Sequence, residues 1–430
     1  MCTPSGYTYE YLSPSNFDLP TAEVQNGVFA PSRQAFKALV IRTLDYLTVP
    51  GVKKISEYAH AGLPIIFDGG VPTRLWAYHK CAAAKVTTIM NELAKLDNVH
   101  VIEGPRNLAD EFMSLGIEPL TKVSSNGSWY TVWREDTQND IDYVFLYNEL
   151  NSTTAGTIEF ASTKVPYWFD AWTGERTPVV LFEQTESRTK IPVTLYGNQT
   201  AIVAFLPKAL EPVPAHHAIS ASSGILSLTA SGKSISVKAN NQGGALQVKV
   251  SDGSVHNIAT TEAEPFDLQT WNLTVEHWSP PADLSDAKTT AVKTNTTHEL
   301  PYLISWQDID SLKNTSGRGY YTTTFHWPPK EGADGAFINF GRVFHTLSAS
   351  INGHRLSPLD TSRAEADIGP YLKDGENKLE VVIATTLINA LRPIRPDLRF
   401  STTTPIKNIP PAQDYGLKRV VLTPYKETLI

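Results

Sequence analysis

Three runs between residues 318 and 391 decide the fold class of this chain: RGYYTTTFHWP (318–328), GAFINFGRVFHTLSASINGHRL (335–356) and DIGPYLKDGENKLEVVIATTLINAL (367–391). Apolar and polar residues alternate within each run, which is typical of half-buried antiparallel strands. Asn352-Gly353 and Asp374-Gly375 lie within these runs. They predict tight turns between the strands, because such pairs accept the positive φ that tight turns need. The pattern predicts a β-sandwich, not the core of an enzyme.

Length and composition limit the number of domains and the class of partner. The chain has 430 residues, 41% of them hydrophobic and 19% charged, which is ordinary for a soluble protein with room for about two to four domains. The net charge of -7 and the pI near 5.9 argue against a nucleic-acid partner, since such binding depends on clustered Lys and Arg. No run of about eighteen apolar residues indicates a membrane span.

The first 117 residues alternate strand and helix. Buried strands are predicted at Lys37–Arg42, Leu63–Asp68 and Val99–Glu103, and helices at Val52–Ala61, Cys81–Leu96 and Leu108–Leu115. Continuous apolar strands separated by helices predict a parallel sheet covered on both faces, resembling a small flavodoxin-like domain (1–117).

No cofactor is expected on this sheet. The residues after Arg42, TLDYLTVP, lack the glycines that let backbone amides surround a phosphate, and Gly69-Gly70 is read as a plain turn. Cys81 falls inside a predicted helix, so an inert thiol is favoured over a nucleophile. A bridge from Cys81 to Cys2, the other cysteine, stays open, although the spacing does not favour it.

Beyond Glu118 the period of the pattern changes to two, which predicts three further units. These are a small β-sandwich (118–207), linking β-structure rich in Ser, Ala and Gly (208–265), and a jelly-roll β-sandwich (266–430). Within the first unit, the run DAWTGE at Asp170–Glu175 predicts a turn anchored by a buried Trp and closed by Gly174. Sugar stacking on Trp168 or Trp172 is the alternative.

The jelly-roll runs resemble the galactose-binding-like sugar-binding domain of family 2 type glycoside hydrolases. The run from VFHTLSASINGHRLSPLD to VVIATTLINAL is most similar to the copy near the C-terminus of family 106, α-L-rhamnosidase-like proteins. The order of the four units resembles that family over nearly the whole chain, and the DAWTGE turn matches its small sandwich. In that family these units follow a catalytic (β/α)8 barrel, which has no counterpart here, so no catalytic residue is carried over.

The resemblance makes carbohydrate the expected ligand. Sugars are bound by flat aromatic faces and planar polar groups. The candidates lie in or beside the jelly-roll strands: Trp306, Tyr320, Trp327, Arg342, His345 and Asp360. For each aromatic residue a role in the core is the alternative, and Arg342 and Asp360 could instead form a buried pair.

Neither a catalytic dyad nor a metal site is predicted. The acidic pairs Glu262 and Glu264, Asp308 and Asp310, and Asp140 and Asp142 have the sequence context of solvated loops. The acidic run at residues 135–142 lacks the alternate spacing and central glycine of a calcium loop, and a hairpin tip is favoured. His216 and His217 are adjacent, so their side chains diverge.

Six Asn-x-Ser/Thr sequons favour a secreted glycoprotein, with chance occurrence as the alternative. They begin at Asn126, Asn151, Asn198, Asn272, Asn295 and Asn314. The first residues, MCTPSGYTYEYLSP, have neither the basic region nor the apolar core of a signal peptide. Both observations agree if the chain is the back part of a longer, extracellular polypeptide.

The leading hypothesis is an accessory region of an α-L-rhamnosidase-like hydrolase that supports a missing barrel and binds plant or microbial polysaccharide. An independent secreted carbohydrate-binding or structural protein is the alternative, and an active glycosidase is the third reading.

Overall fold

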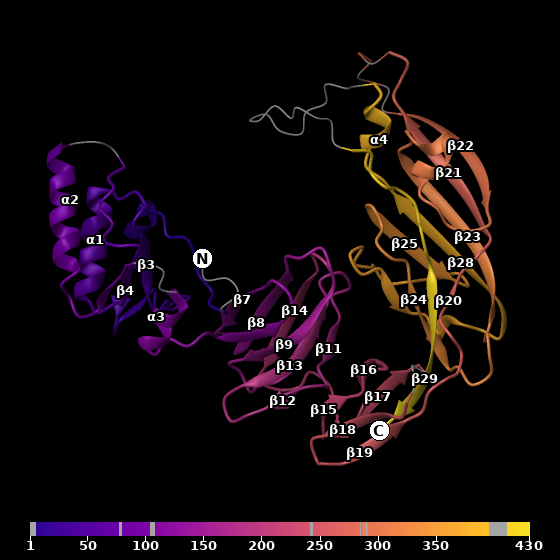
Figure 1. Cartoon of the computed structure of the whole chain (residues 1–430), viewed down its shortest axis with the longest axis horizontal. Coiled ribbons are helices and arrows are strands. Elements are labelled where there is room, and N and C mark those ends of the chain that lie inside the picture. Colours follow the sequence, from indigo (N-terminus) through magenta and orange to yellow (C-terminus); the bar gives the residue numbers. More distant parts are fainter. Residues whose placement is uncertain are drawn as a thin grey trace.

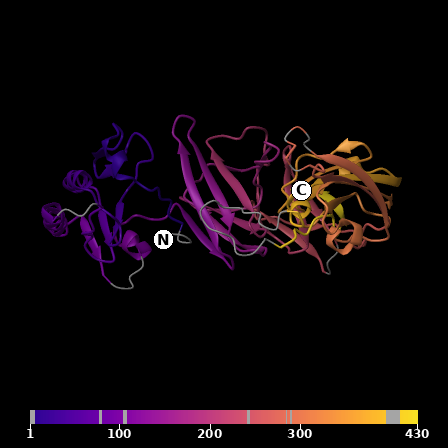
Figure 2. The same ribbon diagram turned by 90° about the horizontal axis from the view of Figure 1, so that it is seen from above.

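The computed structural model describes residues 6–76, 80–103, 108–240, 244–283, 285, 286, 288, 291–394 and 411–430. Four units follow one another along an open arc, with a helical unit at one end and the largest strand unit at the other (Figure 1). Figure 2 shows the same succession from above. The expectation of a β-rich chain of several units with one α/β unit in front is confirmed.

The first unit (the α/β unit, residues 6–117) contains a parallel sheet in the order β3-β4-β5. Its strands alternate with helices: β3 (Leu39–Arg42), α1 (Val49–His60), β4 (Ile65–Asp68), α2 (Lys80–Leu93), β5 (Val99–Ile102) and α3 (Leu108–Ser114). Ile65 and Phe67 pack on the α1 and α2 side, whereas Ile66 packs with Phe112 of α3 on the other. The prediction of a parallel sheet with two covered faces is therefore confirmed. Its three strands follow chain order, whereas a flavodoxin-like sheet has five strands in the order 2-1-3-4-5. The flavodoxin-like part of the prediction is not confirmed.

A segment before β3 completes this unit and ties it to the next. It forms a 3-10 turn, η1 (Pro14–Asp18), and a hairpin of β1 (Val24–Gln25) and β2 (Val28–Phe29). Phe17 and Phe29 pack against Tyr58 of α1. The hydroxyl of Thr8 accepts a hydrogen bond from the backbone N–H of Trp133 in the second unit, at 2.8 Å.

The second unit (the small sandwich, residues 121–206) has two antiparallel sheets in the orders β11-β10-β14-β8-β7 and β12-β13-β9-β6. Apolar residues of both sheets, among them Trp133 and Phe160, share one core. The strands are β6 (Thr121–Ser125), β7 (Trp129–Asp136), β8 (Ile141–Asn148), β9 (Thr154–Phe160), β10 (Val165–Phe169), β11 (Arg176–Pro178), β12 (Glu183–Gln184), β13 (Thr189–Leu195) and β14 (Thr200–Leu206).

The turn at Asp170–Glu175 forms as predicted, but the anchor is different. Asp170 accepts hydrogen bonds from the backbone N–H groups of Trp172 and Thr173, at 2.7 and 3.1 Å. Gly174 closes the turn at a φ of 78°. Trp172 is 54% exposed, so the prediction of a buried Trp as the anchor is wrong for this residue. The carboxylate of Asp170 anchors the turn instead, as Asp side chains do in many turns.

The third unit (the linking unit, residues 218–258) is more than a connection, because its strands share a buried core. They are β15 (Ala218–Ala221), β16 (Ile225–Ser231), β17 (Ser234–Ala239), β18 (Leu246–Val250) and β19 (Val255–Ile258). One sheet has the order β15-β18-β19, and β16 and β17 begin the other.

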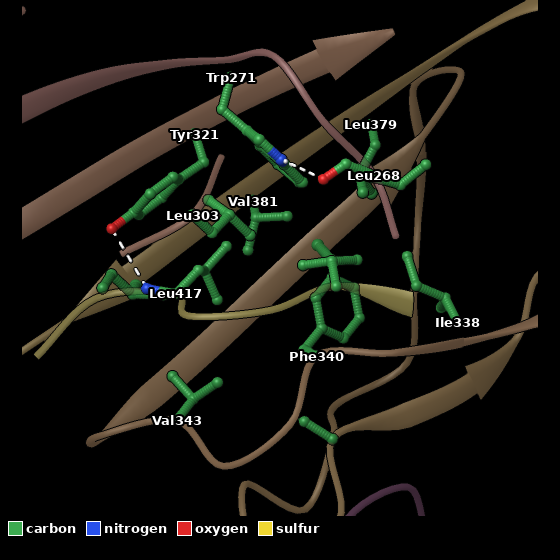
Figure 3. Packing of buried hydrophobic residues seen from close by; sticks show 14 of the residues in the cluster. Leu268, Trp271, Leu303, Tyr321, Ile338, Phe340, Val343, Leu379, Val381 and Leu417 are labelled. Atoms are coloured by element: carbon green, nitrogen blue, oxygen red, sulfur yellow. Dashed lines mark hydrogen bonds between the residues drawn. The ribbon is translucent and has the colours of Figure 1, made fainter. Parts of the chain in front are cut away.

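The fourth unit (the C-terminal sandwich, residues 266–430) contains a six-stranded sheet in the order β22-β21-β23-β28-β25-β26. Facing it are β20, β24, β27 and β29, and the buried residues between the two layers form the largest core of the chain (Figure 3). The elements are β20 (Phe266–Asp267), β21 (Trp271–Ser279), β22 (Val292–Leu300), η2 (Trp306–Asp308), η3 (Asp310–Leu312), β23 (Gly317–Trp327), β24 (Gly335–Asn339), β25 (Thr346–Ile351), β26 (His354–Arg355), β27 (Glu365–Asp367), η4 (Gly369–Tyr371), β28 (Gly375–Ala384), α4 (Ile388–Leu391) and β29 (Val421–Leu429).

Strand β29 belongs to two units. Its first half pairs with β20 and β24 of the C-terminal sandwich, and its second half pairs with β17 of the linking unit. It is drawn in yellow, running from the C-terminal sandwich down to the linking unit (Figure 1). The last strand therefore pairs with strands on both sides of the predicted domain boundary between residues 265 and 266.

Candidate functional site

Two of the six candidate residues are core residues. Trp306 is fully buried, and its indole N–H donates to the hydroxyl oxygen of Tyr321 at 2.8 Å. Trp327, at the end of β23, is only 4% exposed. Neither indole has a face open to a sugar ring, so the prediction of sugar binding is wrong for both residues, and the alternative of a core role holds.

Arg342 and His345 are exposed and lie at one end of the C-terminal sandwich. The guanidinium of Arg342 lies 4.8 Å from the centroid of the Phe344 ring. The ring of His345 lies 5.4 Å from that of Phe344 and 5.8 Å from that of Tyr415, which in turn contacts buried Trp306. A line of ring contacts thus connects this exposed end with the core.

Asp360 is half-buried and closes a turn. Its carboxylate accepts hydrogen bonds from the backbone N–H and the hydroxyl of Ser362, at 2.9 and 2.7 Å. Among the described residues no ion pair joins it to Arg342. The alternative of a buried pair is wrong, because Arg342 is exposed and its guanidinium lies over a ring.

Tyr320 lies on the solvent side of the six-stranded sheet and is 37% exposed. Residues that pair across antiparallel strands share one side of a sheet, so the register defines its surroundings. Tyr320 pairs with Thr274 and with Val382, and Arg318 pairs with Glu276. We call the surface around Tyr320 the outer face; it comprises Thr274, Glu276, Trp278, Lys293, Arg318 and Tyr320.

On the outer face two cations and one carboxylate contact the indole of Trp278. Lys293 Nζ lies 4.6 Å and Arg318 Cζ 5.6 Å from the centroid of the Trp278 ring, within the range of cation–π attraction. The indole N–H of Trp278 donates to Glu276 at 2.6 Å. This hydrogen bond, with help from the two cations, lowers the pKa of Glu276, so the carboxylate is ionised at neutral pH.

The sequence reading singled out Tyr320 but missed its neighbours. Glu276 and Trp278 are two residues apart on β21, and Lys293 pairs with Trp278 from β22. Alternation within WNLTVEHW could have placed Glu276 and Trp278 on one side of a strand. Only the register between strands brings Arg318 and Lys293 beside them.

The acidic hairpin tip of the small sandwich borders an open depression of about 390 Å³. Lys164 fills the space between its carboxylates, with Nζ 2.7 Å from Asp140 and 3.2 Å from Asp142. Burial lowers the pKa of Lys164, but the hydrogen bonds to both carboxylates outweigh this and raise it. The ammonium compensates one of the two negative charges and contacts both carboxylates, so Asp140 and Asp142 are not two open carboxyl groups facing one sugar. Glu135 and Asp136 also line the depression.

The other acidic pairs are also solvated. Glu262 binds Lys330 and Asp310 binds Lys313, each at 2.7 Å on the surface. Within the described ranges the pKa is lowered for the carboxyl groups of Glu118, Asp136, Asp252, Glu262, Glu276, Asp283, Asp310 and Asp414. A general acid of a glycosidase needs the opposite shift.

Several remaining predictions concern surface groups. All six sequon asparagines are exposed, and Asn198 donates its side-chain N–H to Asn151 at 2.7 Å. Cys81 is an exposed free thiol in α2, whereas Cys2 lies outside the described residues. In the part of the chain that the structure describes, no three His, Cys, Asp or Glu side chains gather as metal ligands, and no helix is long and apolar enough to cross a membrane.

The chain superposes on part of a rhamnosidase from Novosphingobium sp. PP1Y. The match covers 97% of this chain and 36% of the rhamnosidase, with a TM-score of 0.59 and 16% identity. The chain shares the fold of that part. It spans about a third of the length of the enzyme. At 16% identity the likeness concerns the fold alone.

Weaker matches include a β-D-glucuronidase from Dictyoglomus thermophilum (39% of this chain, 29% of that one, 17% identity, TM-score 0.23). Another is an α-L-rhamnosidase from Streptomyces avermitilis, solved with L-rhamnose (72% and 24%, 12% identity, TM-score 0.18). These scores are too low to support an argument, although all these neighbours are glycoside hydrolases. No protein-family model and no curated protein match the chain.

Proposed function

We propose that the chain is an accessory region of an α-L-rhamnosidase-like glycoside hydrolase, in which it supports a catalytic barrel encoded elsewhere and offers a carbohydrate-binding surface. The observation that carries the proposal is the match of nearly the whole chain to a third of a rhamnosidase. The sequence resemblance to the units that follow the barrel in family 106 proteins supports the same assignment.

The carboxylates support a noncatalytic role. Hydrolysis of a glycosidic bond needs two carboxyl groups facing one sugar, one of them protonated near neutral pH. Among the described residues Asp140 and Asp142 share one lysine, and Glu262 and Asp310 each bind a surface lysine that lowers the pKa of the carboxyl group.

The first test measures hydrolysis of aryl α-L-rhamnosides by the purified chain alone. We expect no turnover above that of a heat-denatured sample. Robust turnover that a single Asp→Asn or Glu→Gln change abolishes would refute the noncatalytic assignment and favour the active glycosidase.

The second test concerns carbohydrate binding on the outer face. Tyr320 offers a partly exposed ring, its strand partner is Thr274, and Arg318 lies two residues away on the same side of β23. In calorimetry with rhamnose-containing oligosaccharides, we expect Tyr320→Ala to weaken binding about tenfold. Tyr302→Ala is the matched control, because Tyr302 is 61% exposed on the same unit but outside the outer face. Absence of heat with any glycan would leave only the supporting role.

The genome separates the leading proposal from the alternative. An in-frame barrel encoded upstream of Met1 is expected for an accessory region. Glycan binding without such a barrel would favour an independent carbohydrate-binding protein instead.

A further inference from the structure

The loops after β3 and β4 lie together at the carboxyl edge of the parallel sheet in the α/β unit. The hydroxyl of Thr43 contacts the carbonyl oxygens of Asp68 and Gly70, at 3.0 and 3.2 Å, which ties one loop to the other. Further along, Leu47 and Leu75 form a parallel bridge, with hydrogen bonds from Leu47 N to Arg74 O at 2.7 Å and from Trp76 N to Leu47 O at 2.9 Å. The two loops are thus held as a short extension of the sheet.

This extension presents apolar side chains to water. Leu47 is buried at 5% exposure, whereas Tyr46 and Trp76, which alternate with Leu47 and Leu75, point outward, and Leu44 is exposed in the turn before them. Leu44 is 71%, Tyr46 52% and Trp76 73% exposed. The rings of Tyr46 and Trp76 meet edge to face, with centroids 5.6 Å apart and planes at 89°. We call this group the aromatic corner; it comprises Leu44, Tyr46, Arg74 and Trp76.

Arg74 adds an uncompensated charge. Its guanidinium lies 4.9 Å from the centroid of the Tyr46 ring, and one N–H group makes a long contact of 3.4 Å with the carbonyl oxygen of Leu44. The nearby carboxylate of Asp45 is already bound by Arg42, through the backbone N–H at 2.9 Å and the guanidinium at 3.2 Å. No carboxylate within the described ranges pairs with Arg74, so most of its five donors face solvent.

We propose that the aromatic corner is a second saccharide-binding site, and that it takes an acidic, uronate-containing oligosaccharide. A pyranose ring lies with its C–H groups against the Trp76 indole, and the carboxylate of a uronate accepts two hydrogen bonds from the Arg74 guanidinium. This site lies in a different unit from the outer face and stands independently of it.

Other ligand classes fit the corner less well. A phosphate at the start of α1 would need free backbone N–H groups, but Thr48 caps this end by accepting from Gly51 N, and Pro50 has no N–H. A protein partner needs about 800 Å² on each side for a stable interface. Three exposed apolar or aromatic side chains around one cation match one or two sugar rings better.

The test is calorimetry on the whole chain with trigalacturonate as the probe, compared with its methyl ester, which has the same shape without the charge. We expect trigalacturonate to bind more tightly than the ester. Trp76→Ala should weaken binding of both probes about tenfold, whereas Arg74→Gln should remove only the preference for the acid.

Trp172→Ala serves as the matched control, because Trp172 is an exposed Trp in another unit that no ring or cation contacts among those described. Circular dichroism verifies that each variant folds. Absence of binding to either probe, or binding that Trp76→Ala leaves unchanged, would overturn the proposal. Self-association that depends on Trp76, seen by light scattering, would overturn it in favour of protein docking.

Discussion

At the scale of single residues, the most informative side chain is Trp306, because the core role that the sequence left as the alternative is the one it has. The Trp306 indole fits between two glycines, and a Cβ on Gly319 or Gly416 would lie 2.7 Å from it. Gly416 also has a φ of 102°, which residues with a side chain rarely adopt. The sequence shows each of these residues but not their meeting, since they lie on three different segments.

The burial of Trp306 leads to a stability prediction. Trp306→Ala should lower the free energy of unfolding of the C-terminal sandwich by about 3–5 kcal/mol, since it leaves a large cavity and removes the hydrogen bond to Tyr321. Urea unfolding followed by circular dichroism measures the change, with Trp172→Ala as the exposed control. A loss below about 1 kcal/mol would contradict the assigned core role.

At the scale of elements, the parallel strands and the helices of the α/β unit were predicted to within a few residues, whereas η1, β1 and β2 were not predicted. The runs KALVIR and LPIIFD contain β3 and β4, because buried parallel strands are recognisable from continuous apolar residues. The outer face could not be predicted in the same way. Its members pair across β21, β22 and β23, and local alternation does not give the register between strands.

The junction between the small sandwich and the linking unit should respond to pH. The ring of His217 stacks on that of Phe182, with centroids 3.8 Å apart. Burial, aided by the neighbouring His216, lowers the pKa of His217. The folded chain therefore holds fewer protons than the unfolded chain as the pH falls through about 6.5, and stability must decrease over that range.

We expect His217→Gln to reduce this loss of stability between pH 7.5 and 5.5. Urea unfolding of both proteins across that interval measures it. His60→Gln is the control, because His60 is exposed on α1. Equal pH dependence in His217→Gln and the unchanged chain would refute the assignment.

At the scale of the whole molecule, β29 makes the third and fourth units dependent on one another. Ile235 and Ile430 exchange both backbone hydrogen bonds, at 2.8 and 3.0 Å. Removal of residues 426–430 should therefore free the edge of β17 while the core pairing of β23 with β28 persists. Hydrogen–deuterium exchange should show faster exchange in peptides of residues 234–239 and unchanged exchange in residues 317–327. Equal protection of β17 in both proteins would contradict the shared-strand arrangement.

The shared strand also dictates an order of events during synthesis on the ribosome. Ser236 and Glu427 bond to each other although they are 191 residues apart, so β17 emerges long before its partner exists. The α/β unit and the small sandwich need no later segment for their sheets and can fold as they emerge. Until the nine residues of β29 arrive, β17 and β24 each present an unpaired edge, and chaperones that cover nascent strands would have their main task there.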